Sequence, residues 1–101
     1  ALPTEHGDGA LELAEGLRAT AFPNPARGMT TLVVSGLVAD ERVTLRVFDL
    51  SGALVASLFE GESPDHGELR IAWETGSNAA GMYFFEAING ERAVRGKLIL
   101  E

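Results

Sequence analysis

The chain has 101 residues, of which 46% are apolar, and it contains no cysteine. This length corresponds to one small domain with a modest core, and the apolar content excludes a wholly disordered chain. Fifteen acidic and eight basic residues give a formal net charge of −7, which argues against binding to nucleic acid or to an anionic membrane surface. Without cysteine, disulfides and thiol catalysis are excluded, and without 18 consecutive apolar residues we expect no membrane insertion.

The first part of the chain differs from the rest. Residues 1–17 carry four acidic residues and no lysine or arginine, and the first nine include one proline and two glycines. We therefore predict a linker or N-terminal extension over residues 1–17 and a folded domain over residues 18–101. Within the linker, residues 10–17 fit a short strand as well as a single helical turn. Because the chain does not begin with methionine, we expect it to be a fragment of a longer protein.

From residue 18 onward, short stretches rich in apolar residues are separated by turn residues, and none has a sustained helical period. The seven predicted strands are residues 18–22, 30–35, 43–50, 54–60, 68–74, 82–88 and 92–100. Short strands at roughly ten-residue spacing, without helices, are typical of sandwiches. The sequence therefore predicts an all-β fold, an immunoglobulin-like antiparallel β-sandwich of about seven strands.

Alternation of side chains predicts which faces are buried. Val43, Leu45 and Val47 fall on one face of their strand, with polar residues between them. Residues 82–88 are apolar on nearly both faces, as expected for a strand in the middle of a sheet. Asn89-Gly90 predicts a two-residue hairpin of type I′ with these two residues at its centre.

Few residues suggest catalysis or metal binding. The acidic residues of the loops lack the regular spacing of a calcium site, and we expect them to be solvated. The two histidines are far apart, and no serine lies in a Gly-x-Ser-x-Gly sequence. The residues considered are Asp40, Glu41, Glu60, Glu62, Asp65, His6 and His66. We predict no catalytic, cofactor-binding or metal-binding residue, and no enzyme activity.

Two aromatic residues raise the alternative of a carbohydrate-binding module. Trp73 and Tyr83 are the only residues of their kinds, and exposed rings of this kind can stack on sugars. Both lie in phase with apolar neighbours along their strands, which favours positions in the core. The carbohydrate hypothesis requires at least one of the two rings to be exposed.

The segment Phe22-Pro23-Asn24-Pro25 lies between the first two predicted strands. Proline fixes φ and favours an extended conformation in the preceding residue. Since the two prolines cannot donate backbone hydrogen bonds, we predict a stiff, extended segment that ends strand pairing and protects a sheet edge.

Together with other motifs, this segment resembles the C-terminal sorting domains of the type IX secretion system, also called the Por secretion system. The resemblance covers about residues 20–101, and an immunoglobulin-like fold of related kind occurs in flagellar hook-capping proteins. The family motif residues are Phe22, Pro23, Asn24, Pro25, Asp49, Gly52, Trp73, Gly81 and Tyr83, followed by the terminal strand Lys97-Leu98-Ile99-Leu100.

The resemblance implies a function in delivery. Such domains direct secreted multidomain proteins of Bacteroidetes through an outer-membrane translocon, after a separate signal has brought them to the periplasm, and onto the cell surface. The implied partners are the type IX translocon, a sortase-like peptidase and a covalently linked N-terminal cargo domain. Lys97, Leu98, Ile99 and Leu100 would be the segment that the translocon recognises, and residues 1–17 would contain the cleavage site.

Many members of this family end in a basic residue, whereas this chain ends in Glu101, so that Arg92, Arg95 and Lys97 would supply the positive charge. Three hypotheses remain at this point: a sorting and surface-attachment signal, a passive immunoglobulin-like spacer or interaction module, and a carbohydrate-binding module.

Overall fold

A computed structural model of the chain describes residues 11–12 and 16–101. The predictions for the other residues, including most of the linker, its cleavage site and His6, lie outside this part of the chain. Across the described residues the chain forms strands and turns without a helix, so it contains no helix long enough to cross a membrane. The predicted all-β class is confirmed.

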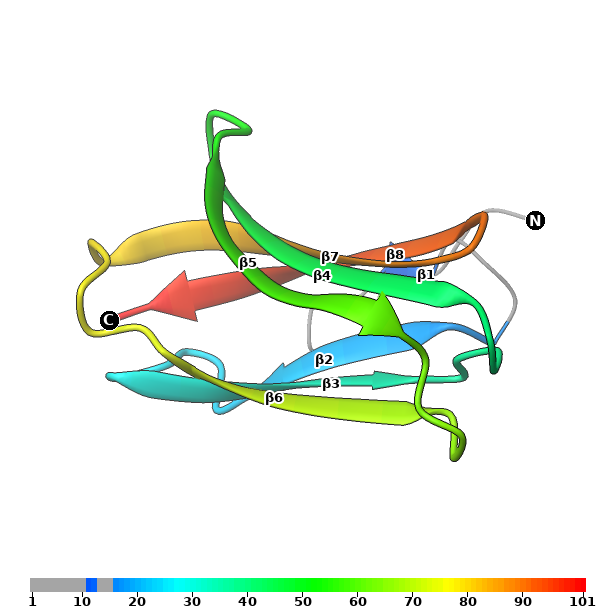
Figure 1. The fold of residues 1–101 in the computed structure, drawn as a ribbon. Coiled ribbons are helices and arrows are strands. Elements are labelled where there is room, and N and C mark those ends of the chain that lie inside the picture. Colours follow the sequence, from blue (N-terminus) through cyan, green and yellow to red (C-terminus); the bar gives the residue numbers. More distant parts are fainter. Residues whose placement is uncertain (1–10, 13–15) are drawn as a thin grey trace.

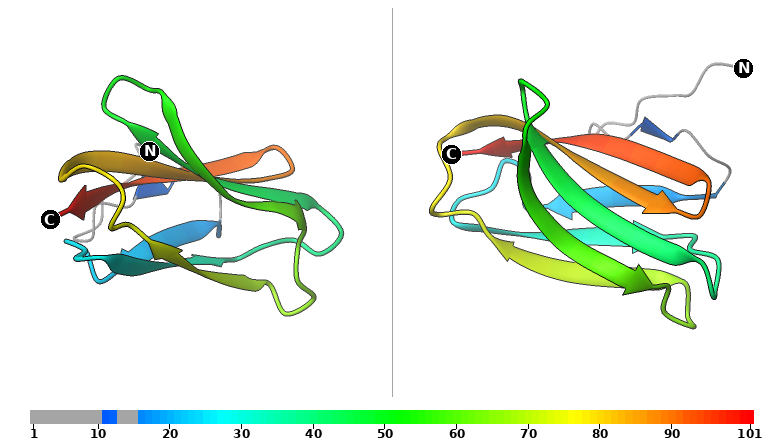
Figure 2. Two further views of the ribbon diagram at one scale, coloured as in Figure 1. Left: turned by 60° about the vertical axis from the view of Figure 1, so that its left-hand side comes forward. Right: turned by 45° about the horizontal axis from the view of Figure 1, so that its top comes forward.

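Two antiparallel sheets pack face to face (Figure 1). The larger sheet consists, in spatial order, of β1 (Leu11–Glu12), β8 (Arg92–Leu100), β7 (Gly81–Asn89), β4 (Arg42–Asp49) and β5 (Leu54–Glu62). The smaller sheet consists of β2 (Arg18–Phe22), β3 (Met29–Ser35) and β6 (Glu68–Glu74) in that order. Figure 2 shows the same two layers from two further directions.

The inward-facing side chains of both sheets form one apolar core. Val43, Leu45 and Val47 are fully buried, as their alternation predicted. β7 lies inside the larger sheet, between β8 and β4, which confirms the prediction of a central strand. Phe85 of β7 and Leu32 of β3 are among the largest fully buried side chains. Each large apolar side chain removed from water in this way contributes about 1.5–3 kcal/mol to folding.

One glycine makes this packing possible. Gly96 of β8 pairs with Phe85 of β7, and a Cβ atom at Gly96 would lie 2.4 Å from Cζ of the Phe85 ring. Since real Cβ atoms do not approach so closely, the ring occupies the space that a side chain at residue 96 would need. The sequence alone does not show this contact, because it depends on the pairing of the two strands.

β5 forms an edge of the larger sheet and is irregular. Its pairing with β4 shifts register between Leu45 and Arg46 and again between Val47 and Phe48. Such bulges bend a strand and increase its twist. In Figures 1 and 2, β5 curves away from the plane of its sheet toward β6. An edge shaped in this way is a poor template for pairing with another chain.

The last hairpin corrects the predicted turn type. Asn89 pairs with Arg92, so the central residues are Gly90 and Glu91 rather than Asn89 and Gly90. Gly90 has a φ of 62°, and Glu91 is not among the residues with positive φ. Glycine at the first central position followed by a residue with negative φ is the pattern of a type II′ turn. The hairpin was predicted correctly, but its centre was placed one residue too early.

The register differs because the Asn89 side chain is needed in the core rather than in the turn. Asn89 is buried, and its Oδ1 accepts hydrogen bonds from the backbone N of Val38, at 2.8 Å, and from the Arg92 guanidinium. Its Nδ2 donates to the carbonyl of Arg42 at 3.4 Å. Asn89 therefore connects the hairpin to the β3–β4 loop, a role that sequence reasoning missed.

Part of the expected linker belongs to the sandwich. β1 pairs with β8 through Leu11↔Arg95 and Glu12↔Val94. Of the two alternatives for residues 10–17, a strand or a helical turn, these two residues therefore form a strand. Leu17 is fully buried in the core. The boundary of the preceding linker itself stays a prediction.

Candidate functional site

The motif residues singled out in the sequence gather at one end of the sandwich. Gly81 pairs with Leu100, and Asp49 pairs with Tyr83. On the smaller sheet Trp73 pairs with Thr30, whose hydroxyl donates to the carbonyl of Pro23 at 2.8 Å. In Figure 1 the β2–β3 and β6–β7 connections and the C-terminus share this end. Motifs spread over most of the chain therefore form one region, which we call the C-terminal end of the sandwich.

The terminal strand contributes to this region in two ways. Leu98 and Leu100 point inward and are buried in the core. Lys97 and Ile99 point outward, and Ile99 is 39% exposed. Its neighbour across the sheet, Met82, is also exposed. In the folded domain, only alternate residues of the predicted recognition segment are therefore accessible through their side chains.

The edge of β8 that faces away from β7 is covered by Asn24 and by Ala26, two residues further along the chain. The Asn24 Nδ2 donates to the carbonyl of Lys97 at 2.8 Å, and its Oδ1 accepts from the backbone N of Ile99 at 3.0 Å. The backbone N of Ala26 donates to the carbonyl of Ile99 at 2.8 Å, and the carbonyl of Ala26 accepts from the backbone N of Glu101 at 2.9 Å. Further along the same edge lies β1. Segments from the beginning of the domain thus cover the edge of its last strand.

These contacts correct the predicted shape of the Phe22–Pro25 segment. The chain bends at residues 23–25 instead of running extended, and the Phe22-Pro23 and Asn24-Pro25 peptide bonds are both cis. The bends bring Asn24 and Ala26 from the smaller sheet to the edge of β8 in the larger one. The prediction that pairing ends here is confirmed, since β2 ends at Phe22. The edge that the segment covers belongs to the opposite sheet.

Asp49 organises the turn between β4 and β5. Its Oδ1 accepts hydrogen bonds from the Ser51 hydroxyl at 2.6 Å, from the Ser51 backbone N at 2.9 Å and from the Ala53 backbone N at 3.0 Å. These hydrogen bonds hold the pKa of the Asp49 carboxyl below its usual value of 3.8. The Ser51 hydroxyl has the largest effect, and the Ala53 amide has the next largest. Gly52 has a φ of 87°, in the left-handed region that glycine adopts without strain. The Asp49 carboxylate therefore stabilises the turn in which it lies.

The two candidate sugar-binding rings lie in the core. Trp73 is 9% exposed, and Tyr83 is buried to a similar extent. The Tyr83 hydroxyl donates to the carbonyl of Ala79 at 2.7 Å, four residues upstream, and thereby holds the β6–β7 loop. A tyrosine that bonds to nearby upstream backbone is a feature of immunoglobulin-like sandwiches. The predicted core positions are confirmed, and neither ring offers a surface for stacking on a sugar.

The candidate metal and catalytic residues are dispersed. His66 and the five carboxylates considered above are exposed, as expected for solvated side chains, although Glu60 and Glu62 lie in β5 and not in a loop. Within residues 11–12 and 16–101, no three histidine, aspartate or glutamate side chains are grouped so as to hold a metal ion. At the end of the chain, the Glu101 carboxylate pairs with Arg27, with 3.1 Å between Oε1 and Nε. The acidic terminus therefore has a basic neighbour in the β2–β3 loop.

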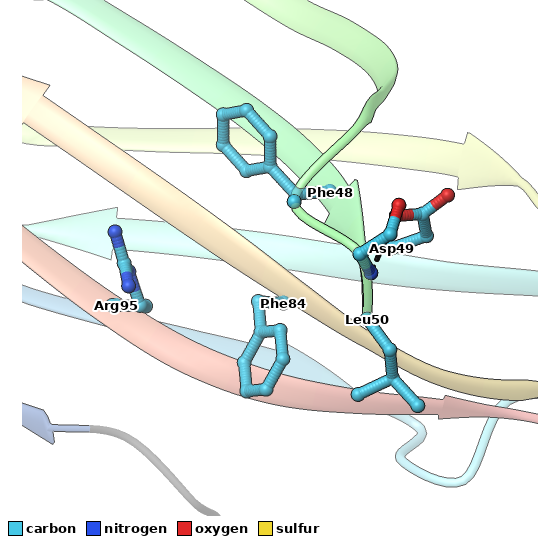
Figure 3. A pocket seen from close by; sticks show the side chains of 7 residues that line it. Phe48, Asp49, Leu50, Phe84 and Arg95 are labelled. Atoms are coloured by element: carbon cyan, nitrogen blue, oxygen red, sulfur yellow. Dashed lines mark hydrogen bonds between the residues drawn. The ribbon is translucent and has the colours of Figure 1, made fainter.

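Sequence reasoning missed a hollow on the outer face of the larger sheet. Its volume is about 340 Å³, and it lies beside the turn that Asp49 organises. Figure 3 shows Phe84 between Arg95 and Leu50, with Phe48 on the neighbouring strand. These four residues come from β4, β7, β8 and a turn, so they become neighbours only through strand pairing. The signal in the sequence that pointed to this hollow was the second apolar row of residues 82–88, which faces outward.

The fold and this region define the class of the protein: an antiparallel sandwich whose sequence motifs meet at the end that carries its last strand. The family described as "Secretion system C-terminal sorting domain" matches residues 20–101, and the chain belongs to that family. It is a type IX secretion C-terminal sorting domain, as the resemblance of its motifs predicted. A sorting domain of this kind implies a secreted or cell-surface protein.

Solved structures show the same fold. Dimeric latent PorU from Porphyromonas gingivalis is similar at 22% identity and a TM-score of 0.62, over 81% of this chain but only 9% of the PorU chain. A DUF3244-family protein with an immunoglobulin-like β-sandwich fold from Bacteroides vulgatus matches at 16% identity and a TM-score of 0.54, over 85% of each chain. The CARDB domain of a Pyrococcus furiosus protein, solved with di-metal ions, matches at 15% identity and a TM-score of 0.51, over 86% of this chain and 90% of that chain. Among curated proteins, none matches this sequence.

Proposed function

We propose that this domain carries a covalently attached N-terminal cargo from the periplasm through the type IX outer-membrane translocon and onto the cell surface. The observation that carries the proposal is the family match over residues 20–101, which includes every motif residue named above. The geometry supports it, because those residues build one end of the domain around its last strand.

In this proposal the domain contributes recognition and no catalysis. Any enzymatic activity belongs to the cargo, and a sortase-like peptidase would separate the two by cutting within residues 1–17. The immunoglobulin-like spacer remains the competing hypothesis, because the solved structures with the same fold show the fold alone. A spacer would fold as this domain does but would not direct export.

The experiment is to fuse the 101-residue chain to the C-terminus of a periplasmic reporter in a host with a type IX system. We expect the reporter to reach the surface or the medium only when the domain is attached. The reporter without the domain, exported to the periplasm by the same N-terminal signal, is the control. Retention of the fused reporter in the periplasm, with a domain that is folded and intact, would favour the spacer.

The structure also changes how the terminal strand should be tested. Deleting residues 97–101 should abolish export, but it removes two buried leucines from the core at the same time. Losing one such side chain typically costs about 2–5 kcal/mol, so the deleted domain would unfold. Substitutions at the outward-facing residues separate recognition from folding.

A further inference from the structure

The outer face of the larger sheet carries a continuous apolar area at the C-terminal end of the sandwich. We call this area the outer patch; it consists of Phe48, Leu50, Met82, Phe84 and Ile99. Phe48 pairs with Phe84, and Met82 pairs with Ile99. Leu50 connects the two pairs, because it lines the hollow beside Phe84 and a second one, of about 300 Å³, beside Met82.

Basic side chains border the outer patch. Arg46, Glu86 and Arg95 lie in one row across β4, β7 and β8, and Lys97 lies beside Phe84 in the next row. Arg95 contacts Glu86 with 3.1 Å between Nη2 and Oε2. Three basic residues thus stand around one glutamate in a chain whose net charge is −7. Asp49, beside the patch, is occupied by the hydrogen bonds of its own turn, and Glu101, two residues after Ile99, pairs with Arg27.

The final strand offers no other means of recognition while the domain is folded. Its backbone is paired with β7 on one side and covered by β1, Asn24 and Ala26 on the other. A partner therefore has no free edge of this strand to which it could add a strand of its own. Because Leu98 and Leu100 point into the core, only Lys97 and Ile99 of the predicted recognition segment Lys97–Leu100 present side chains outward, and these two lie in or beside the outer patch.

We propose that the outer patch is the surface by which the translocon recognises the folded domain, and that the receptor presents apolar side chains between carboxylates. The two hollows are open and have room for apolar side chains of a partner, whereas the basic border matches acidic groups. Within a Debye length of about 8 Å, such local charges outweigh the net charge of the chain. This inference rests on the proposed function, which supplies the receptor.

The test uses the reporter fusion with the full chain and single substitutions at positions of similar exposure. Met82→Glu and Ile99→Glu alter the outer patch, where these side chains are 38% and 39% exposed. Met29→Glu on the outer side of β3 and Val38→Glu in the β3–β4 loop are matched controls, at 48% and 49% exposure. Arg95→Glu tests the basic border. Thermal unfolding of each purified variant verifies folding, and Ile99→Ser replaces Ile99→Glu if the charged variant unfolds.

We expect about a tenfold or larger loss of surface reporter for the outer-patch and Arg95 variants, as for central residues of an interface, and little change for the controls. Export of folded outer-patch variants at the wild-type level would overturn the inference while leaving the proposed function intact. Failure of the wild-type fusion itself would overturn both. Flotation of the purified chain with phosphatidylglycerol vesicles, lost in Ile99→Glu, would assign the patch to a membrane and would also overturn the inference.

Discussion

The side-chain amide of Asn24 takes the place of a neighbouring strand beside Ile99, 75 residues further along the chain. It accepts a hydrogen bond from the backbone N of Ile99 and donates one to the carbonyl of Lys97, as an adjacent strand would do. The Pro-Asn-Pro segment and the terminal strand, which look unrelated in the sequence, are therefore two halves of one structural unit. This contact explains why an asparagine stands between the two prolines.

Asn24→Ala should destabilise the domain by about 1–3 kcal/mol, because it removes two hydrogen bonds to the backbone of β8, one of which is partly buried. Urea unfolding monitored by Trp73 fluorescence measures the change. Asn24→Asp should also destabilise, since a carboxylate can accept from Ile99 but cannot donate to Lys97. Asn78→Ala, at a partly buried asparagine of the β6–β7 loop, is the control. Equal stability of Asn24→Ala and the wild type would contradict this role.

Gly96→Ala should cost about 1–3 kcal/mol, because the added methyl group would collide with the Phe85 ring. The double substitution Gly96→Ala with Phe85→Leu should lose less than the sum of the two single changes, because the smaller side chain makes room. Urea unfolding of the four proteins in this cycle gives the coupling energy. Strictly additive losses would show that Gly96 is needed for another reason.

The Asp49 turn predicts a pH dependence with a definite sign. Because hydrogen bonds hold the pKa of the folded state below 3.8, the ionised carboxylate stabilises the turn above that value. This contribution decreases as the pH falls through the lower pKa of the folded state. The difference in unfolding midpoint between the wild type and Asp49→Asn should therefore shrink below pH 3.8. Ser51→Ala should raise the Asp49 pKa, measured by NMR titration, and an unchanged titration would refute the assigned cause.

Trp73 fluorescence checks the exclusion of a sugar-binding surface. A tryptophan that is 9% exposed should emit at short wavelength and be quenched poorly by acrylamide. Unfolding in urea should shift the emission to longer wavelength and raise the quenching toward that of the free amino acid. Strong quenching in the folded domain would mean that the ring is exposed, and the carbohydrate hypothesis would return.

The sequence predicted the strands well because alternation is a local property. β2, β6 and β8 have the predicted bounds, and the remaining predicted strands differ by one or two residues at one or both ends. The centre of the last hairpin was misplaced, since local turn preference gave way to the buried hydrogen bonds of Asn89. The bent form of the Pro-Asn-Pro segment also escaped prediction, because contacts with β8, more than 70 residues away, determine it.

The functional region was predicted only as separate motifs. Their resemblance to a family pointed to Phe22–Pro25 and to the last strand, but nothing in either stretch shows that Asn24 contacts Ile99. The outer patch was not predicted, because Phe48, Phe84 and Ile99 become neighbours only through the strand order β8-β7-β4. Side chains that meet across strands require the topology, which periodicity does not supply.

The most direct measurement of the central claim is the amount of fused reporter on the cell surface in two otherwise identical hosts, one of which lacks a working type IX translocon. A sorting signal should place the reporter on the surface of the competent host and leave it in the periplasm of the deficient one, with the domain folded in both. Equal surface levels in the two hosts, or periplasmic retention of the folded fusion in both, would contradict the claim that this domain is a type IX sorting signal.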